Sequence, residues 1–265
     1  MDNKEIDISV VLLTYNQEYY VRQALDSILN QNFTGRWEII VGDDCSLDNT
    51  ANVIEIGKGN FDFIKVFTNS KNLGLSKNYE KAILLSKGKY IAYIEGDDYW
   101  TDEFKLQKQF DFLELNPKYV LAFHDFVLID NVGNIISESN LEKPNLKKNR
   151  SKKEMVAGCL IHQNTMMFRN VISKFPLGFF KSRNHDTFLI AYLSNWGLAG
   201  YVYCKPLHYR YLNTSLWSSL DNKKKHLNGI ITYWWIFTIA PVETLWPLFL
   251  RLLSKIRSFI LSHST

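Results

Sequence analysis

Residues 89–100, KYIAYIEGDDYW, constrain the possible fold more strongly than any other part of the sequence. The first half of this stretch is almost entirely apolar or aromatic, and it ends without a proline in Glu95, Gly96, Asp97 and Asp98. A short apolar run that ends in a turn signal is typical of a strand buried on both faces. Its carboxylates then lie at the carboxyl end of the strand, which is where open α/β sheets bind their ligands.

The acidic cluster has two interpretations. Carboxylates this close together repel one another, and a hard divalent cation such as Mg²⁺ or Mn²⁺ relieves the repulsion by taking oxygen ligands. The alternative is a solvated acidic turn that caps the next helix, a position where Asp is favoured. The cluster alone does not decide between them, and the rest of the chain favours the metal site.

Three apolar runs precede this stretch, at residues 8–13, 37–41 and 63–67, and segments with helical patterns separate them. Strands that alternate with helices predict a parallel sheet built by right-handed crossovers. The carboxyl ends of parallel strands share one edge of the sheet. The polar groups that follow these strands, at 14–16, 43–44 and 95–98, should therefore meet in one ligand crevice.

The second half of the chain has a weaker pattern. It predicts a helix over residues 102–115, a longer strand over 120–129, a short strand over 165–169, a helix over 186–196 and a strand-like segment over 200–205. Residues 143–153 are rich in Lys and Arg and favour a solvated surface loop. A lid over an anionic substrate is the alternative for this loop.

Composition and missing motifs exclude several classes of protein. The chain has 265 residues with a net charge of +4, which suits one large α/β domain with or without a helical appendage and does not indicate a nucleic-acid partner. It has neither a G-x-G-x-x-G after the first strand nor a P-loop motif. The three cysteines lack the spacing of a disulfide framework or a zinc site, and no signal peptide is apparent. We therefore expect a cytoplasmic protein.

The final segment, residues 221–265, differs from the body of the chain. Residues 229–250 are strongly apolar, but Pro241, Glu243 and Pro247 interrupt them, which argues against a membrane-spanning helix. Residues 245–261 place basic side chains among apolar ones, as interfacial helices do. We favour contact with the cytoplasmic face of a membrane, and the alternatives are packing against the rest of the chain and dimerisation. Membrane contact would suit a lipid-linked saccharide as acceptor.

Six segments in order resemble glycosyltransferase family 2: VVLLTYNQ, IIVGDDCSLDNT, NLGLSKN, GKYIAYIEGDDYW, NHDTFL and YRYLNTSLWS. Together they cover roughly residues 8–219. The resemblance implies a GT-A fold, that is, a Rossmann-like α/β fold with a mostly parallel central sheet flanked by helices. It divides the chain into a glycosyltransferase domain at 1–220, with a nucleotide-binding half (1–100) and an acceptor half (101–220), and a C-terminal helical extension at 221–265.

The resemblance also implies roles for individual residues. Asp186 stands where the family has its catalytic base, and Glu95-Gly96-Asp97 stands where it has its D-x-D motif. Asp97 and Asp98 are the implied ligands or supports of an Mn²⁺ or Mg²⁺ cofactor. The implied nucleotide-binding residues are Thr14, Tyr15, Asn16, Glu18, Asp43, Asp44, Lys77, Glu95, Gly96 and Arg210.

One position departs from the family pattern. Family members often read Y-R-x-H near the end of the domain, whereas here Tyr209 and Arg210 are followed by Tyr211 and Leu212. The missing His can face the metal or the diphosphate, so its absence puts strict metal dependence in question. Arg210 or Lys77 would then neutralise the diphosphate.

These residues predict an inverting glycosyltransferase that uses a nucleotide-diphospho-sugar, with UDP favoured, and a saccharide or lipid-linked acceptor in the synthesis of surface polysaccharide or lipopolysaccharide. A metal and a cationic side chain would stabilise the leaving diphosphate, and Asp186 would accept the proton of the acceptor hydroxyl. The alternatives are a non-catalytic nucleotide-sugar-binding module and a sugar-phosphate nucleotidyltransferase. Asp186 could instead cap its helix.

Overall fold

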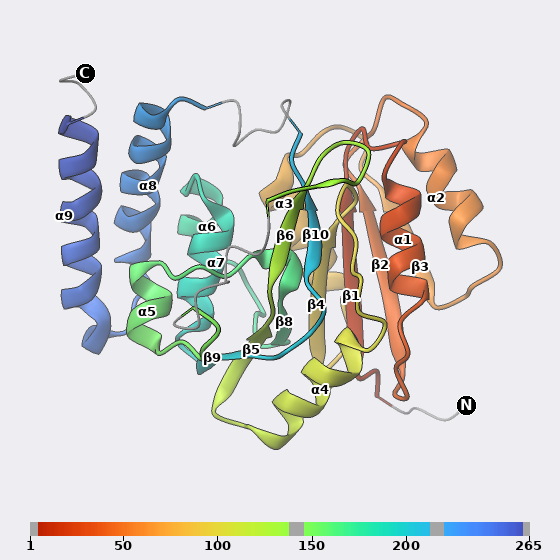
Figure 1. The fold of residues 1–265 in the computed structure, drawn as a ribbon, viewed down its shortest axis with the longest axis horizontal. Helices are drawn as coiled ribbons and strands as arrows, with labels where there is room; N and C mark the ends of the chain where they lie inside the picture. The colour runs from red at the N-terminus through yellow and green to blue at the C-terminus, as the bar shows by residue number, and fades with distance from the viewer. Residues whose placement is uncertain (1–4, 138–145, 213–219, 262–265) are drawn as a thin grey trace.

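The computed structural model describes residues 5–137, 146–212 and 220–261, and a seven-stranded sheet crosses the middle of the molecule (Figure 1). The strands lie in the order β3-β2-β1-β4-β8-β5-β9. Their bounds are β1 Ile8–Thr14, β2 Trp37–Asp43, β3 Ile64–Thr68, β4 Tyr90–Glu95, β5 Tyr119–Phe123, β8 Met167–Arg169 and β9 Leu198–Tyr201. Neighbouring strands are parallel except β8, which is antiparallel to both β4 and β5. The predicted mostly parallel α/β sheet is confirmed.

The first half of the chain follows the predicted alternation of strands and helices. The helices are α1 Val21–Leu29, α2 Thr50–Lys58, α3 Leu75–Leu85 and α4 Lys105–Leu115. All of β1 is buried, and its side chains alternate between two apolar clusters. Val10 packs in the cluster that contains Leu25 of α1, and Val11 packs in the cluster that contains Tyr79 of α3. The sheet is therefore covered by helices on both faces, as the unbroken apolar runs predicted.

The strand predicted at 120–129 is wrong, because the chain turns at His124 and Asp125. β5 stays in the large sheet, whereas β6, Phe126–Ile129, joins a smaller sheet in the order β10-β6-β7 with β7, Ile135–Ser137, and β10, Leu207–Arg210. The Asp125 carboxylate accepts the N–H of Phe126 at 2.8 Å, and His124 Nδ1 lies 2.8 Å from the Asp125 carbonyl. Local hydrogen bonds from these two side chains thus accompany the turn from one sheet to the other.

The basic segment predicted as a loop at 143–153 is only partly irregular. Residues 143–145 lie outside the described part of the chain, but Arg150 pairs with Ala199 of β9 through two backbone hydrogen bonds of 2.7 and 3.1 Å. Helix α5, Lys152–Ala157, then starts on a capping box formed by Ser151 and Glu154. The loop prediction is therefore wrong from Arg150 onward. The strand predicted at 200–205 is observed earlier, as β9.

The C-terminal segment packs against the rest of the chain through one side of its helices. It contains α8, Asn222–Ile236, the short helix η2, Val242–Thr244, and α9, Leu245–Leu261, which forms the outer edge of the molecule (Figure 1). Ile236 and Leu248 share one buried cluster with Phe188 of α7, His185–Leu193, and Phe179 of α6, Leu177–Lys181. No helix within the described ranges is long and apolar enough to cross a membrane. The structure thus agrees with the alternative in which this segment packs against the rest of the chain.

The shared cluster leads to a testable difference between two leucines of α9. Leu248 is fully buried, whereas Leu250 is 48% exposed. We expect Leu248→Ala to reduce the free energy of unfolding by about 2–5 kcal/mol, the usual range for a buried Leu. Leu250→Ala should change it by less than about 0.5 kcal/mol. Urea unfolding measures both, and equal small effects would show that the segment does not belong to the core.

Candidate active site

The strand register brings the predicted polar groups to one edge of the sheet. β1 lies between β2 and β4, with Thr14 opposite Asp43 and Leu13 opposite Glu95. The N–H of Gly96 donates to the carbonyl of Leu13 at 2.8 Å, so the turn after β4 stays beside the end of β1. A Cβ on Gly96 would lie 2.9 Å from Thr14 Oγ1, which explains why this turn has no side chain. The crevice predicted from the sequence is therefore present.

The loop after β1 is tied to the loop after β2. The N–H of Asn16 donates to Ser46 Oγ at 2.9 Å, and the Glu18 carboxylate accepts the N–H of Asn49 at 2.8 Å. Asn16 has a φ of +52°, a left-handed conformation that Asn tolerates better than most residues. Tyr15 is exposed beside them. Asn16 and Glu18 thus shape this wall of the crevice, and Tyr15 offers an aromatic face to a ligand.

The two acidic residues after β2 are buried and already hydrogen-bonded. Asp43 accepts from both the hydroxyl and the N–H of Ser46. The Asp44 carboxylate accepts the N–H groups of Leu73 and Gly74 at 2.9 and 2.8 Å, which fixes the loop before α3. These contacts make Asp44 a support for that loop, and its role in nucleotide binding stays a prediction. Of the two acidic residues, Asp43 has the better position for contact with a nucleotide, because it lies opposite Thr14 at the end of the strands.

The three carboxylates after β4 have different surroundings. Glu95 Oε1 accepts from Gln163 Nε2 at 2.8 Å. Asp98 is 1% exposed, and its two oxygens accept from the N–H of Arg210 and from Asn164 Nδ2. Asp97 Oδ1 is buried with no hydrogen-bond partner among the described residues. Asp97 thus has an oxygen available to a cation, whereas each oxygen of Asp98 already accepts one hydrogen bond within the protein. The role of Asp98 as a ligand or support of the metal stays a prediction.

Burial raises the pKa of each of these carboxyls. The pKa of Glu95 is raised to about 7 by burial and by the charge of Asp97. Burial raises that of Asp98 well above its usual value, and it raises that of Asp97 although Arg210 opposes the change. A group of oxygen donors that resists ionisation fits a hard divalent cation, which would replace the excess protons.

The donor set also indicates how such a cation would be held. Within the described residues, no three His, Cys, Asp or Glu side chains are arranged to enclose a metal ion. Mg²⁺ and Mn²⁺ commonly bind to one or two carboxylates and take their remaining ligands from substrate phosphates and water. The free oxygen of Asp97 fits that mode of binding.

Sequence reasoning missed the short helix that supports this cluster, η1, Gln163–Thr165. Its Gln163 and Asn164 side chains are the donors to Glu95 and Asp98. Two further side chains hold the backbone of η1. Trp100 Nε1 donates to the Asn164 carbonyl at 2.9 Å, and Gln109 Nε2 donates to the Thr165 carbonyl at 2.8 Å. The sequence signal was the polar pair Gln163-Asn164 between apolar segments in IHQNTMMF. Such a pair does not indicate which residues it contacts.

The guanidinium of Arg210 is held by contacts within the protein, and its role at the diphosphate stays a prediction. The side chain is 3% exposed and donates to the carbonyls of Asp97, Asp130 and Asn131 and to Gln23 Oε1, each at 2.9 Å. The structure thus makes Arg210 a link between the β4 turn, β6 and α1. Lys77 is exposed on the first turn of α3, one helical turn before Lys81 and on the same side of the helix.

Asp186 lies in the first turn of α7, where Asn184 rather than Asp186 is the N-cap residue. Its carboxylate accepts the N–H of Thr187 at 2.7 Å, and burial raises its pKa. The charge of Asp186 also contributes to the raised pKa of Glu95, so the two groups share one electrostatic environment. Between α3 and α7 a small cavity is lined by Tyr79, Gln163 and His185 among others. The structure therefore brings the predicted base close to the carboxylate cluster.

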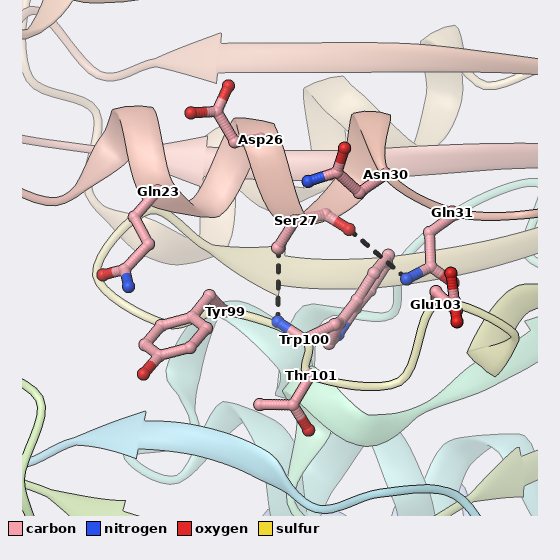
Figure 2. A pocket seen from close by; sticks show the side chains of 9 residues that line it. All are labelled: Gln23, Asp26, Ser27, Asn30, Gln31, Tyr99, Trp100, Thr101 and Glu103. Atoms are coloured by element: carbon pink, nitrogen blue, oxygen red, sulfur yellow. Dashed lines mark hydrogen bonds between the residues drawn. The ribbon is translucent and has the colours of Figure 1, made fainter.

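A second hollow lies beside α1 and is lined by none of the predicted site residues, although Gln23 in its lining accepts from Arg210. Figure 2 shows this groove, of about 270 Å³, between the exposed face of α1 and the segment from Tyr99 to Glu103. Its charged lining residues are Asp26 and Glu103, and it has no basic side chain. The groove therefore offers no positive charge of its own lining to an anionic diphosphate.

The raised pKa of Glu95 predicts a pH dependence of stability. A carboxyl whose pKa rises from 4.5 to about 7 on folding stabilises the fold fully below the lower value and loses that contribution as the pH rises through about 7. Without metal, Glu95→Gln should therefore gain stability relative to wild type over this range, by on the order of 1–2 kcal/mol because the side chain is partly solvated.

Thermal unfolding across pH measures this difference, and Glu114→Gln is a contrasting control. Lys89 lowers the pKa of Glu114, so removing that charge should cost stability at neutral pH and less in acid. The interpretation of Glu95 fails if both variants show the same trend with pH.

Known proteins resemble this chain in both sequence and structure. The chain is 33% identical over 168 residues to an uncharacterized glycosyltransferase of Methanocaldococcus jannaschii, which covers 63% of this chain and 57% of the relative. It is 26% identical over 186 residues to the Escherichia coli UDP-Glc:alpha-D-GlcNAc-diphosphoundecaprenol beta-1,3-glucosyltransferase WfgD, covering 69% of this chain and 68% of that protein. An uncharacterized Mycobacterium tuberculosis relative is 31% identical, and the match covers 61% of this chain and only 46% of that protein.

The fold matches solved glycosyltransferases over nearly the whole chain. Staphylococcus aureus TarS in complex with UDP-GlcNAc has a TM-score of 0.71 at 19% identity, covering 96% of this chain and 73% of that one. The mannosyltransferase PcManGT of Pyrobaculum calidifontis, with GDP-Man and Mn²⁺, has a TM-score of 0.64 at 14% identity, covering 99% and 76%. The family model for glycosyl transferase family 2 matches residues 9–175. This match spans more than half of the chain, and the protein therefore belongs to glycosyl transferase family 2, with a GT-A fold.

Proposed function

We propose that this protein transfers a sugar from a nucleotide-diphospho-sugar to a hydroxyl group of a saccharide or lipid-linked saccharide, with inversion at the anomeric carbon. The observation that carries this proposal is the buried, unpartnered oxygen of Asp97 at the carboxyl edge of the sheet. An oxygen ligand without a protein partner costs free energy unless a ligand or water satisfies it. The electrostatic proximity of Asp186 and Glu95 supplies a base in the same crevice.

UDP is the nucleotide that we favour for the donor. The printed name of the E. coli relative specifies UDP-Glc, and one TarS structure contains UDP-GlcNAc. The structure of PcManGT contains GDP-Man and Mn²⁺, so the fold also accommodates another base. The diphosphoundecaprenol acceptor in the name of WfgD supports a lipid-linked acceptor and a role in surface polysaccharide synthesis. A cytoplasmic location is consistent with the free cysteines Cys45, Cys159 and Cys204.

The chemistry follows from the positions of the acidic groups. A divalent cation, when bound at Asp97, supplies positive charge at the diphosphate. Asp186 accepts the proton of the acceptor hydroxyl, whose oxygen forms a bond to the anomeric carbon. The bond from that carbon to the phosphate oxygen breaks, and the nucleoside diphosphate leaves with the electron pair. The raised pKa of Asp186 makes it a better proton acceptor than an ordinary carboxylate. A single displacement inverts the anomeric centre.

A thermal-shift panel tests the donor site. UDP, GDP, CDP and TDP, each with and without Mn²⁺, should be compared on wild type, Asp97→Asn and a matched control, Asp26→Asn, in the separate groove of Figure 2. A ligand at 100 times its Kd stabilises the fold by about 2.7 kcal/mol. We expect a metal-dependent shift of a few degrees with UDP that Asp97→Asn loses and Asp26→Asn keeps. The proposed donor site is wrong if no nucleotide shifts the melting temperature.

Substitution of the base tests transfer itself. Asp186→Asn should lower kcat by about 10²–10⁴-fold, the usual contribution of a general base, and should keep the UDP shift. Asp111→Asn on the exposed side of α4 is the control and should keep full activity. Release of UDP identifies a glycosyltransferase, release of pyrophosphate a nucleotidyltransferase, and binding without turnover in the wild type a binding module. Full activity of Asp186→Asn would exclude it as the base.

A further inference from the structure

Helix α9 exposes an apolar stripe along its whole length on the side away from α8. Leu248 and Leu252 face the core, whereas Trp246, Phe249, Leu250, Leu253, Ile260 and Leu261 are all exposed. The exposed residues recur at intervals of three and four, so they share one face of the helix. Because α9 is the outermost helix of the molecule (Figure 1), this face points away from the domain.

Helix α8 also exposes apolar side chains, but on a different surface. Leu227 and Trp234 are exposed and lie two helical turns apart, on one side of α8. Lys223 of α8 has its Nζ 5.9 Å from the centre of the Phe259 ring, and Phe259 lies on the side of α9 that carries Leu248 and Leu252. The contact thus joins α8 to the inner side of α9, and the contiguous exposed apolar surface is the stripe of α9 itself. Such a surface marks an interaction site more often than chance exposure does.

The charge within the stripe selects the partner. Arg251 donates to the Tyr233 hydroxyl and Lys255 packs beside Gly229, so both lie on the side of α9 that faces α8, whereas Arg257 is exposed. Arg257 lies within the apolar stripe of α9, and the sequence of α9, LWPLFLRLLSKIRSFIL, contains no acidic residue. A contact between two copies of α9 would bury Arg257 without a counter-charge, which is costly. Lipid phosphates supply that counter-charge.

We propose that the exposed stripe of α9 binds the surface of an anionic lipid bilayer. The helix lies in the plane of the interface, with its apolar side chains in the acyl boundary and Arg257 at the headgroups. Trp246 suits this position, because the indole ring has an apolar body and a polar N–H. The opposite side of α9 remains in the protein core through Leu248 and Leu252.

Vesicle flotation of the full chain tests this proposal. Wild type should bind vesicles that contain phosphatidylglycerol, bind phosphatidylcholine vesicles much more weakly, and lose binding as salt rises. The double variant Phe249→Ser/Leu253→Ser should lower binding about tenfold or more, since it removes two large apolar side chains from the stripe. The control Ile56→Ser/Leu115→Ser removes two apolar side chains of α2 and α4 that are even more exposed, and it should bind like wild type.

The charge at Arg257 provides a second variant that leaves the apolar stripe intact. Arg257→Glu should weaken binding to phosphatidylglycerol vesicles and leave the melting temperature unchanged, because the residue is exposed. The proposal is overturned if wild type does not bind anionic vesicles or if the stripe variant binds as well as wild type. Self-association that the stripe variant abolishes, without vesicle binding, would assign the surface to a second copy instead. These assays need no donor or turnover, so their outcome is independent of the proposed glycosyl transfer.

Discussion

The buried carboxylate of Asp98 is the interaction on which the geometry of the crevice depends. It accepts from the backbone N–H of Arg210 in β10 and from the side chain of Asn164 in η1, so one side chain joins the large sheet, the small sheet and a helix from the second half of the chain. Because the group is almost fully buried, the loss of either donor would leave an unsatisfied oxygen at considerable cost. The neighbouring Asp97 is therefore held in place without using its own Oδ1.

Arg210 completes this arrangement from the other side. Its guanidinium is planar and always charged, and it lies 4.5 Å from the centre of the Tyr20 ring while it donates to backbone carbonyls on both sides of the turn. Its charge lowers the pKa of Asp97, in opposition to burial. The crevice thus combines one basic group in a supporting position with several carboxylates around a free oxygen, which suits a cation and a diphosphate bound together.

The parts of the fold that could be predicted are those with a local signal. The buried runs of β1, β2 and β4 end in polar residues, and the shared edge of a parallel sheet brings Thr14, Asp43 and Glu95 together without further information. The donors Gln163 and Asn164 could not be predicted, since their partners are distant in sequence. The break at His124 could not be predicted either, because no glycine or proline marks it in the sequence FHDF. Arg210 and Asp44 were assigned to a ligand because residue type indicates charge and not burial; only the structure shows that protein groups already occupy them.

The shared core of the C-terminal helices has a consequence for how the enzyme would meet its acceptor. Ile236 and Leu248 pack with Phe188 of α7, the helix that also carries Asp186, so α9 and the proposed catalytic base belong to one packed core. A bilayer bound at the exposed stripe of α9 would therefore stand at a set distance from the crevice. The enzyme would therefore favour acceptors whose reactive hydroxyl extends from the membrane by that distance. This preference would not depend on the affinity of the crevice for the sugar itself.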